Sequence, residues 1–402
     1  MKLNKVSMKL LGGILIVGGT AIGAGMLALP VTTAVNGFYP SIIAFFVVYI
    51  FSMATGLLFL ELCLAMPKNA NIISMARHYL GPIGQFFAWI LYIMLFYCLI
   101  IAYVDGGSSM VEFLSEGTLS KIWAMLIFVV IFSTVLYLGT GAVDSVNRVL
   151  MLGLIVTFLF FTVFAFQEIN MDNFSHFKWH GSLFTLPVIF TSFSYQGTLP
   201  SLMQYLDRNK KAMQYSIVIG ITLPFLIYVL WQFLVMGVVP LSGPHGLLEA
   251  KSIGETAVYS LHYFVRNKYI AAAGQVFGFF ALASSLLGVS LGLMDFLSDG
   301  LKIEKIGWKK VFLCALIFIP PMLITHYNPG IFLLTLGYAG GIGCAILLGL
   351  YPALMVWRAR YRMANSPAPI LWGGKPMLIL IVAFVVLELG LEVVKDFKLF
   401  GF

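Results

Sequence analysis

A glycine-rich stretch inside the first apolar run carries the backbone groups most suited to binding a ligand. Gly18-Gly19, Gly23 and Gly25 interrupt a segment that is long enough to cross a bilayer. Glycine is unfavourable inside helices, and opened backbone is tolerated in a membrane only where it is buried in protein or lines a watery cavity. We expect an interrupted helix whose free N–H and C=O groups bind a polar ligand near the membrane midplane. A close helix–helix contact of small residues explains the glycines equally well.

A second interrupted helix is expected between residues 182 and 206. Residues 190–201 are polar, contain Gly197 and Pro200, and lie between two apolar arms. Five predicted crossings separate the two stretches, and an odd number gives two repeats of opposite topology, as in many transporters. This correspondence favours ligand binding over packing for both stretches.

Two interrupted helices side by side suit an amino acid. N–H groups at the start of a half-helix attract a carboxylate, and carbonyl groups at the end of one attract an ammonium group. No Asp, Glu, Lys or Arg occurs between Leu10 and Leu60 or between Leu183 and Leu206. Binding would therefore use backbone and hydroxyl groups, without the roughly 2.5–3.5 kcal/mol that a midplane charge costs on insertion scales.

Acidic residues inside apolar runs are candidates for carrying a proton. Glu61 and Asp295 lie in the predicted cytoplasmic third of their helices, and Asp105 is expected to cap a helix on the outside. A salt bridge at an inner gate, for instance with Lys5 or Lys9, explains the first two equally well. All six histidines fall in loops or at helix ends, so none predicts a proton relay.

Glu388 and Glu392 share one face of the last apolar run at a spacing of four residues. That run lies outside the two predicted repeats. We therefore expect this pair to make a surface or oligomer contact.

The composition requires a membrane protein. Of 402 residues, 60% are hydrophobic and 10% are charged, whereas a soluble domain carries roughly 25% charge. Apolar runs of about 20 residues recur along the chain and predict spanning helices in a single membrane domain over residues 1–402. The net charge of +8 indicates basic cytoplasmic segments rather than nucleic-acid binding.

Cofactor, metal and enzyme motifs are absent from the sequence. The four cysteines lie in apolar runs without CxxC or metal-ligand spacing, so we expect reduced structural thiols. Hydrolase, metalloprotease and phosphate-loop motifs are missing, as are the charged rings typical of channels. An intramembrane enzyme and a passive channel stay the rival classes.

Eleven spans are expected, with the N-terminus cytoplasmic and the C-terminus periplasmic. The N-terminal residues resemble a signal peptide, but the apolar run continues to Pro30, which indicates an uncleaved first helix. Most of the 24 lysines and arginines then lie on the cytoplasmic side. Residues 67–80 are expected to form an amphipathic surface helix, and residues 240–268 a small external helical lid or a solvated loop. The predicted spans are 10–33, 40–66, 82–104, 122–139, 149–166, 182–206, 213–239, 270–296, 311–325, 331–357 and 376–394.

Four segments resemble the bacterial hydroxy/aromatic amino acid permease family. They are Gly19-Thr20-Ala21-Ile22-Gly23-Ala24-Gly25-Met26-Leu27-Ala28-Leu29-Pro30, Phe190-Thr191-Ser192-Phe193 with Gly197 and Pro200-Ser201, Ser285–Leu293 followed by Asp295, and Leu336–Gly340.

The resemblance spans nearly the whole chain. It implies an all-helical, leucine-transporter-type fold with inverted repeats at residues 8–167 and 181–357, and a helix at 376–394 outside them. It also implies uptake of aromatic amino acids, tyrosine first, across the bacterial inner membrane, driven by protons. Membrane lipid is the only other partner expected, and no cofactor is implied.

The same resemblance implies a set of site residues. Tyr103 would close over the substrate carboxylate, with interfacial anchoring as the alternative, and Phe190 and Phe193 would stack on an aromatic substrate. Ser194-Tyr195-Gln196 departs from the Gly-Phe-His-like run of the family, which leaves substrate choice and the proton step open. The full substrate-binding set is Gly19, Thr20, Ala21, Gly23, Ala24, Gly25, Tyr103, Phe190, Ser192, Phe193, Ser194 and Gln196.

A sodium site is the alternative for ion coupling. In sodium-coupled members of this fold, hydroxyls of the eighth helix and carbonyls of the first bind sodium. Ser284 and Ser285 could do so with the carbonyls of Gly19 and Ile22. Hydroxyls bonded to their own helix backbone explain the serines as well, so the coupling ion stays open between proton and sodium.

Overall fold

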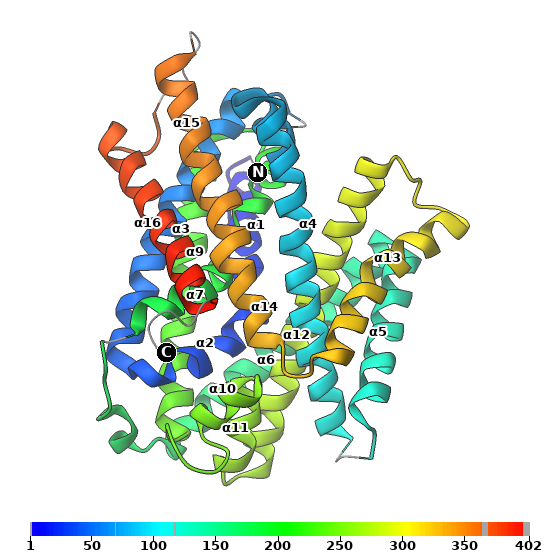
Figure 1. Ribbon diagram of the computed structural model, residues 1–402, viewed down its shortest axis with the longest axis vertical. Coiled ribbons are helices and arrows are strands. Elements are labelled where there is room, and N and C mark those ends of the chain that lie inside the picture. The colour runs from blue at the N-terminus through cyan, green and yellow to red at the C-terminus, as the bar shows by residue number, and fades with distance from the viewer. Residues whose placement is uncertain (1, 69, 116–117, 180, 364–368, 397–402) are drawn as a thin grey trace.

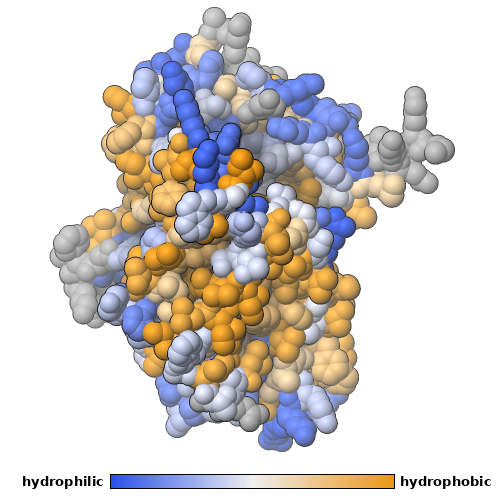
Figure 2. All heavy atoms as spheres, turned by 90° about the vertical axis from the view of Figure 1, so that its right-hand side faces the viewer, coloured by the Kyte–Doolittle hydropathy of each residue, from blue (hydrophilic) through white to orange (hydrophobic). Residues whose placement is uncertain are grey.

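The computed structural model describes residues 2–68, 70–115, 118–179, 181–363 and 369–396. In this part of the chain the regular elements are helices joined by turns and loops, with one isolated bridge between Gly37 and Phe177. Nine of its helices are long and apolar enough to cross a membrane, or ten if one bent pair counts as a single span. Polar side chains gather at two opposite ends of the surface, with apolar ones between them (Figure 2). The expected class, an all-helical multi-span membrane protein, is confirmed.

The helices are as follows: α1 Lys2–Ala21, α2 Gly25–Thr33, η1 Ala34–Asn36, α3 Phe38–Ala65, α4 Ile72–Leu114, α5 Lys121–Leu138, α6 Thr140–Ala165, η2 Phe166–Glu168, η3 Met171–Phe174, η4 Ser182–Thr185, α7 Leu186–Ser192, η5 Gln196–Thr198, α8 Leu199–Tyr205, α9 Lys210–Val238, α10 Leu247–Ile253, α11 Ala257–Phe264, α12 Lys268–Leu301, α13 Gly307–Tyr327, α14 Phe332–Tyr338, η6 Ala339–Leu350, α15 Tyr351–Arg362 and α16 Gly374–Asp396.

Both predicted interruptions are present. The first break covers residues 22–24, between α1 and α2, and the axes on its two sides differ by 49°. The second break covers residues 193–198, where α7 unwinds after Ser192 and the short η5 leads into α8. α7 and α8 have seven residues each, so neither is long enough to be a span by itself.

Helix α4 contains the expected surface helix and the expected third span. The two meet at a kink, where the backbone of Gly81 is not helical (φ 81°) and Pro82 begins the span. The span continues to Leu114, beyond the expected end at residue 104, so Asp105 does not cap it. Asp105 is buried, accepts a hydrogen bond from the Phe332 N–H at 3.0 Å and pairs with Lys121 at 3.0 Å.

The expected tenth span is three segments rather than one regular helix. α14 is followed by the π-helical segment η6 and then by α15. A Cβ atom at Gly340 would lie 1.8 Å from the Pro187 carbonyl oxygen, so this residue permits the close packing of η6 on α7. The predicted lid is helical, since α10 and α11 occupy residues 247–264.

The two ends of the bundle are different. The start of α4, the end of α12 and the end of α15 lie at the end drawn uppermost in Figure 1, which we call the upper end. α10 and α11 cover the opposite, lower end, and α16 descends from the upper end towards it (Figure 1). The two breaks lie between these ends.

Candidate functional site

A cavity of about 1020 Å³ brings the two breaks together with α12. Its lining extends from the breaks to the start of α4 and the last turns of α12, which lie at the upper end (Figure 1), and includes Arg77, Asp295 and Asp299 there. The predicted site residues that line it are Gly19, Thr20, Ile22, Tyr103, Ser194, Ser284, Ser285 and Asp295.

The first break is held against α12 by one hydrogen bond. The Ala24 N–H donates to Ser285 Oγ at 3.1 Å, and Gly23 lies so close that a Cβ there would be 2.4 Å from the same oxygen. The N–H of Gly23 has no hydrogen-bond partner among the described residues. A side chain at residue 23 would therefore have to displace the Ser285 hydroxyl that holds the break.

The second break is braced by a buried glutamine. Gln196 Oε1 accepts a hydrogen bond from the Tyr195 N–H at 2.9 Å, and its Nε2 donates to Thr55 Oγ1 on α3 at 2.9 Å. Gln196 is fully buried and does not line the cavity. Its side chain therefore holds the unwound backbone in place.

Tyr228 of α9 joins the two breaks. Its hydroxyl lies 2.5 Å from the carbonyl oxygen of Ala21 and 2.8 Å from that of Ser192, the last residues of α1 and α7. Gly25 of α2 also touches α7, because a Cβ there would lie 3.0 Å from the Ser192 Cα. The sequence analysis did not single out Tyr228, one of 18 tyrosines.

Aromatic rings form one wall of the cavity. Trp89, Tyr92 and Phe96 of α4 line it together with Phe296 of α12. Tyr92 stacks on Phe96 and on Phe296, with ring centroids 4.5 Å apart in both pairs. The sequence analysis missed this wall, although its residues are spaced by three and four positions, the spacing of one helix face.

Two further polar groups face the cavity. Tyr103 is buried beside Tyr228 and Cys344, and its hydroxyl has no hydrogen-bond partner within the described ranges. Asn147 of α6, which the sequence analysis also missed, lines the cavity with its Oδ1 unpaired in that same part of the chain. Both side chains can offer a hydrogen bond to a bound molecule.

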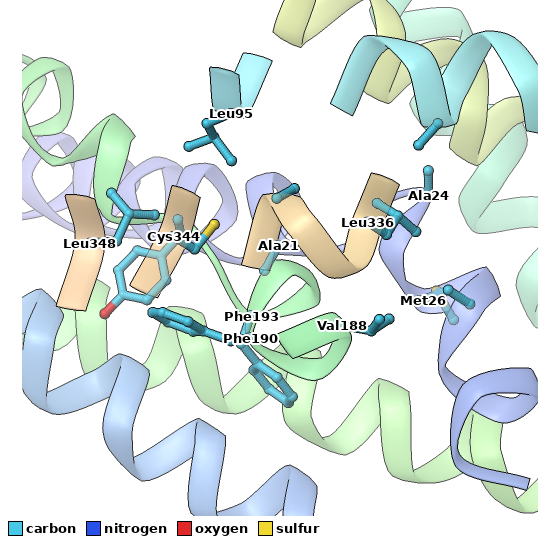
Figure 3. Close-up of a cluster of buried hydrophobic side chains, with 14 of the residues drawn as sticks. Ala21, Ala24, Met26, Leu95, Val188, Phe190, Phe193, Leu336, Cys344 and Leu348 are labelled. Carbon is cyan, nitrogen blue, oxygen red and sulfur yellow. The ribbon is translucent and has the colours of Figure 1, made fainter. Parts of the chain in front are cut away.

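Phe190 and Phe193 lie outside the cavity. Both rings are fully buried in the apolar cluster that Figure 3 draws. The ring centroids of Phe190 and Phe51 are 5.0 Å apart, and those of Phe193 and Tyr228 are 4.9 Å apart. We therefore assign no stacking role to either ring.

The expected ion-coupling residues make different contacts. The Ser284 hydroxyl donates to the Ala281 carbonyl at 3.2 Å, within its own helix. Asp295 pairs with Lys305 at 2.7 Å near the cavity mouth. Lys9 pairs with Asp207 and not with Glu61.

Glu61 forms a buried salt bridge. Its two oxygens accept hydrogen bonds from Arg360 Nε at 2.7 Å and Nη2 at 2.6 Å, and one of them accepts a third from the Ile370 N–H at 3.0 Å. Three donors satisfy this carboxylate, which favours the salt-bridge interpretation, with Arg360 in place of a lysine.

The expectation for Glu388 and Glu392 was wrong. Both carboxyl groups are buried within the chain, where α16 packs against η6. In the described residues no group of three or more His, Cys, Asp or Glu could hold a metal ion.

Comparisons with known proteins show what this chain is similar to. The chain is 34% identical over 382 residues to tyrosine-specific transport system 1 of Haemophilus influenzae, covering 94% of this chain and 95% of that protein. It is 32% identical to a tryptophan-specific transport protein of Pseudomonas aeruginosa, over 93% and 92% of the two chains. The crystal structure of MhsT in complex with L-phenylalanine has the same fold, with a TM-score of 0.66 and 12% identity over 95% of this chain and 98% of MhsT.

The family assignment follows from the extent of these matches. Residues 6–391 match the tryptophan/tyrosine permease family, so both breaks and every residue that lines the cavity lie within the match, which ends inside α16. The chain belongs to the tryptophan/tyrosine permease family, and it is a transporter rather than an enzyme.

Proposed function

We propose that this protein imports aromatic amino acids, tyrosine first, across the bacterial inner membrane by proton symport and alternating access. The observation that carries the proposal is one cavity lined by residues of both breaks, among them Ile22 and Ser194, and by the aromatic wall of Trp89, Tyr92 and Phe96. Such a site offers hydrogen-bond partners to the ammonium and carboxylate groups and a stacking surface to the ring. The names of two relatives, specific for tyrosine and tryptophan, support this substrate class.

The architecture that we propose has eleven spans. It counts α1–α2 and η4–α8 as one broken span each, and adds the nine long helices. Residues 8–167 and 181–357 would then be inverted repeats, with α16 outside them. With the N-terminus cytoplasmic, the cavity opens to the cytoplasm, so this conformation would be the one that releases substrate.

Sodium coupling is the second candidate. Gly19, Ile22, Ser284 and Ser285 all line the same cavity, and the Ser285 hydroxyl oxygen already lies at the first break. These oxygens are ligands of the kind that a hard cation accepts.

Uptake of labelled tyrosine by proteoliposomes tests the proposal. We expect accumulation above the external concentration under a proton gradient alone and none under a sodium gradient alone. Accumulation under a sodium gradient alone would mean that sodium, and not the proton, is the coupling ion. Equilibration without accumulation under both gradients would favour a channel, and absence of flux for every aromatic amino acid would reject the function.

A matched pair of glycine variants tests the first break. Gly23→Ala places a methyl group 2.4 Å from Ser285 Oγ, whereas Gly288→Ala, on the same cavity, meets nothing within 4 Å. We expect Gly23→Ala to reduce uptake about tenfold, or 1.4 kcal/mol, and Gly288→Ala to be near normal. Equal uptake by both would remove the first break from the site.

The larger substitutions Gly23→Leu and Gly25→Leu should abolish uptake. Gly25→Leu also disturbs packing, because its contact is with Ser192 backbone. The alanine pair therefore separates binding from folding more cleanly.

A further inference from the structure

Helix α16 carries a carboxyl group that is buried inside the protein. Glu388 is fully buried, and neither of its carboxyl oxygens has a hydrogen-bond partner among the described residues. It lies near the middle of the 23-residue helix, at a depth where hydrocarbon surrounds a spanning protein. An isolated carboxylate is unstable in such a place, so the group is held in its neutral, protonated form.

The charges around Glu388 do not balance unless a proton is present. Glu392 lies one turn further along α16, and its Oε1 pairs with Lys395 at 3.0 Å while its Oε2 is unpaired in the described part of the chain. The group that faces Glu388 from η6 is the neutral thiol of Cys344, and the adjoining η4 and α7 contain no titratable residue. α15 also packs on α16, but its Tyr351 and Arg360 bond to Gly84 and Glu61. Among the described residues, Lys395 is the one cation that forms an ion pair with either glutamate, and it does so only with Glu392. A second carboxylate close to the first is disfavoured, which favours a proton on Glu388.

Polar groups connect Glu388 to both ends of the molecule. Towards the cavity, the Cys344 thiol lies next to Ser194, which lines the cavity at the second break. Towards the lower end, Glu392 leads to Lys395, whose side chain is 38% exposed and lies near Lys251 of α10. Glu388 therefore lies between a cavity open to the upper end and the surface of the lower end.

The surrounding backbone could respond to the charge of this pair. A Cβ atom at Gly341 of η6 would lie 3.1 Å from Glu392 Oε2 and 3.2 Å from the Pro187 Cβ of α7. η6 thus touches the glutamate pair on one side and the helix that leads into the second break on the other. π-helical segments are frequent at functional sites.

We propose that Glu388 is the site that binds the coupled proton of this permease, an inference that rests on the proton symport proposed above. The proton enters from the lower end past Lys395 and Glu392, resides on Glu388 as a neutral carboxyl group, and leaves towards the cavity past Cys344 and Ser194. One proton then crosses with each substrate, and Glu388 returns to its starting state.

Glu388→Gln tests the proposal because the amide imitates the protonated carboxyl group but cannot release a proton. In proteoliposomes we expect this variant to lose accumulation of labelled tyrosine under a pH gradient and to keep tyrosine exchange at equal pH within about twofold of the wild type. Glu304→Gln, at an exposed carboxylate paired with Lys309, is the control and should behave as the wild type.

If Glu388→Gln accumulated tyrosine as well as the wild type does, the proposal would be overturned. It would also be overturned if the variant lost both accumulation and exchange. Wild-type protein that neither accumulates nor exchanges tyrosine would instead refute the transport function. If the wild type accumulated tyrosine under a sodium gradient alone, both the proton symport proposed above and the proton site at Glu388 would be rejected.

A second measurement uses the unaltered protein and does not depend on the folding of a variant. Dicyclohexylcarbodiimide reacts with protonated carboxyl groups in apolar surroundings, and mass spectrometry locates the product. We expect modification of Glu388 and none of Glu61, whose carboxylate is bound by Arg360. An unmodified Glu388 would overturn the proposal.

Discussion

Glu61 and Glu388 are both fully buried glutamates in spanning helices, yet their surroundings are opposite. Glu61 has three donors, two from the Arg360 guanidinium and one from the Ile370 N–H. Glu388 has none in the described residues. Burial alone therefore does not distinguish a structural carboxylate from a proton-binding carboxyl group. The number of donors does, and four stability measurements can test this contrast.

Arg360→Met should have the largest effect, because it leaves Glu61 buried without its cation. Loss of one partner of a buried pair costs about 3–5 kcal/mol, so we expect the unfolding free energy in a fixed detergent to fall by about that amount. Thermal unfolding measures it, with exposed Arg358→Met of the same helix as the control. Equal melting temperatures for the two variants would show that the salt bridge contributes little.

The double variant Glu61→Gln, Arg360→Met should recover most of that loss. Removing both charges leaves no unpaired ion, and the glutamine oxygen can still accept the Ile370 N–H. A double-mutant cycle on the same unfolding assay gives the coupling energy. Strictly additive losses would mean that the two side chains do not act as a pair.

Lys395→Met should have a smaller effect than Arg360→Met. The Lys395 side chain is 38% exposed, against 4% for Arg360, so water already screens its pair with Glu392. We expect a loss of about 1 kcal/mol or less, measured by the same unfolding assay. A loss as large as that of Arg360→Met would contradict the contrast between the two cations.

Glu388→Gln should have the smallest effect on stability. If the carboxyl group is already neutral and unpaired, an amide of the same shape changes the unfolding free energy by about 0.5 kcal/mol or less. The melting temperature at neutral pH measures this change, with Glu61→Gln alone as the comparison. A loss in Glu388→Gln equal to that in Glu61→Gln would reveal a charged carboxylate with an unrecognised partner.

Most of the fold could be predicted because the bilayer imposes a local rule. Each span needs about 20 apolar residues, so runs such as 213–239 correspond closely to helices such as α9. The breaks were also predictable, since glycine and proline act on their own backbone. The extent of α4 could not be predicted. The charged Asp105 can lie inside the protein only because Lys121 and the Phe332 N–H, which are distant in sequence, bind its carboxylate.

The candidate site was less predictable from sequence. Of the predicted glycines and serines, Gly19, Ser284 and Ser285 line the cavity, whereas Gly23 and Gly25 do not. Among 35 phenylalanines, nothing local separates Phe96, which faces the cavity, from Phe190, which faces the core. The same holds for Glu388, whose burial depends on η6. Whether a side chain points into the cavity or into the core depends on how the helices pack. In a membrane protein both directions are apolar, so the sequence pattern does not distinguish them.

The hydroxyl of Tyr228 constrains how the molecule can move. It touches the last carbonyl of α1 and the last carbonyl of α7, and it has only one hydrogen to share between them. A rearrangement that closes the upper end and opens the lower one must carry these three helices as a single rigid body or separate both contacts at once. If the three helices move as a rigid body, α4 and α12 must move relative to them. The distance between the two breaks then stays constant throughout the transport cycle.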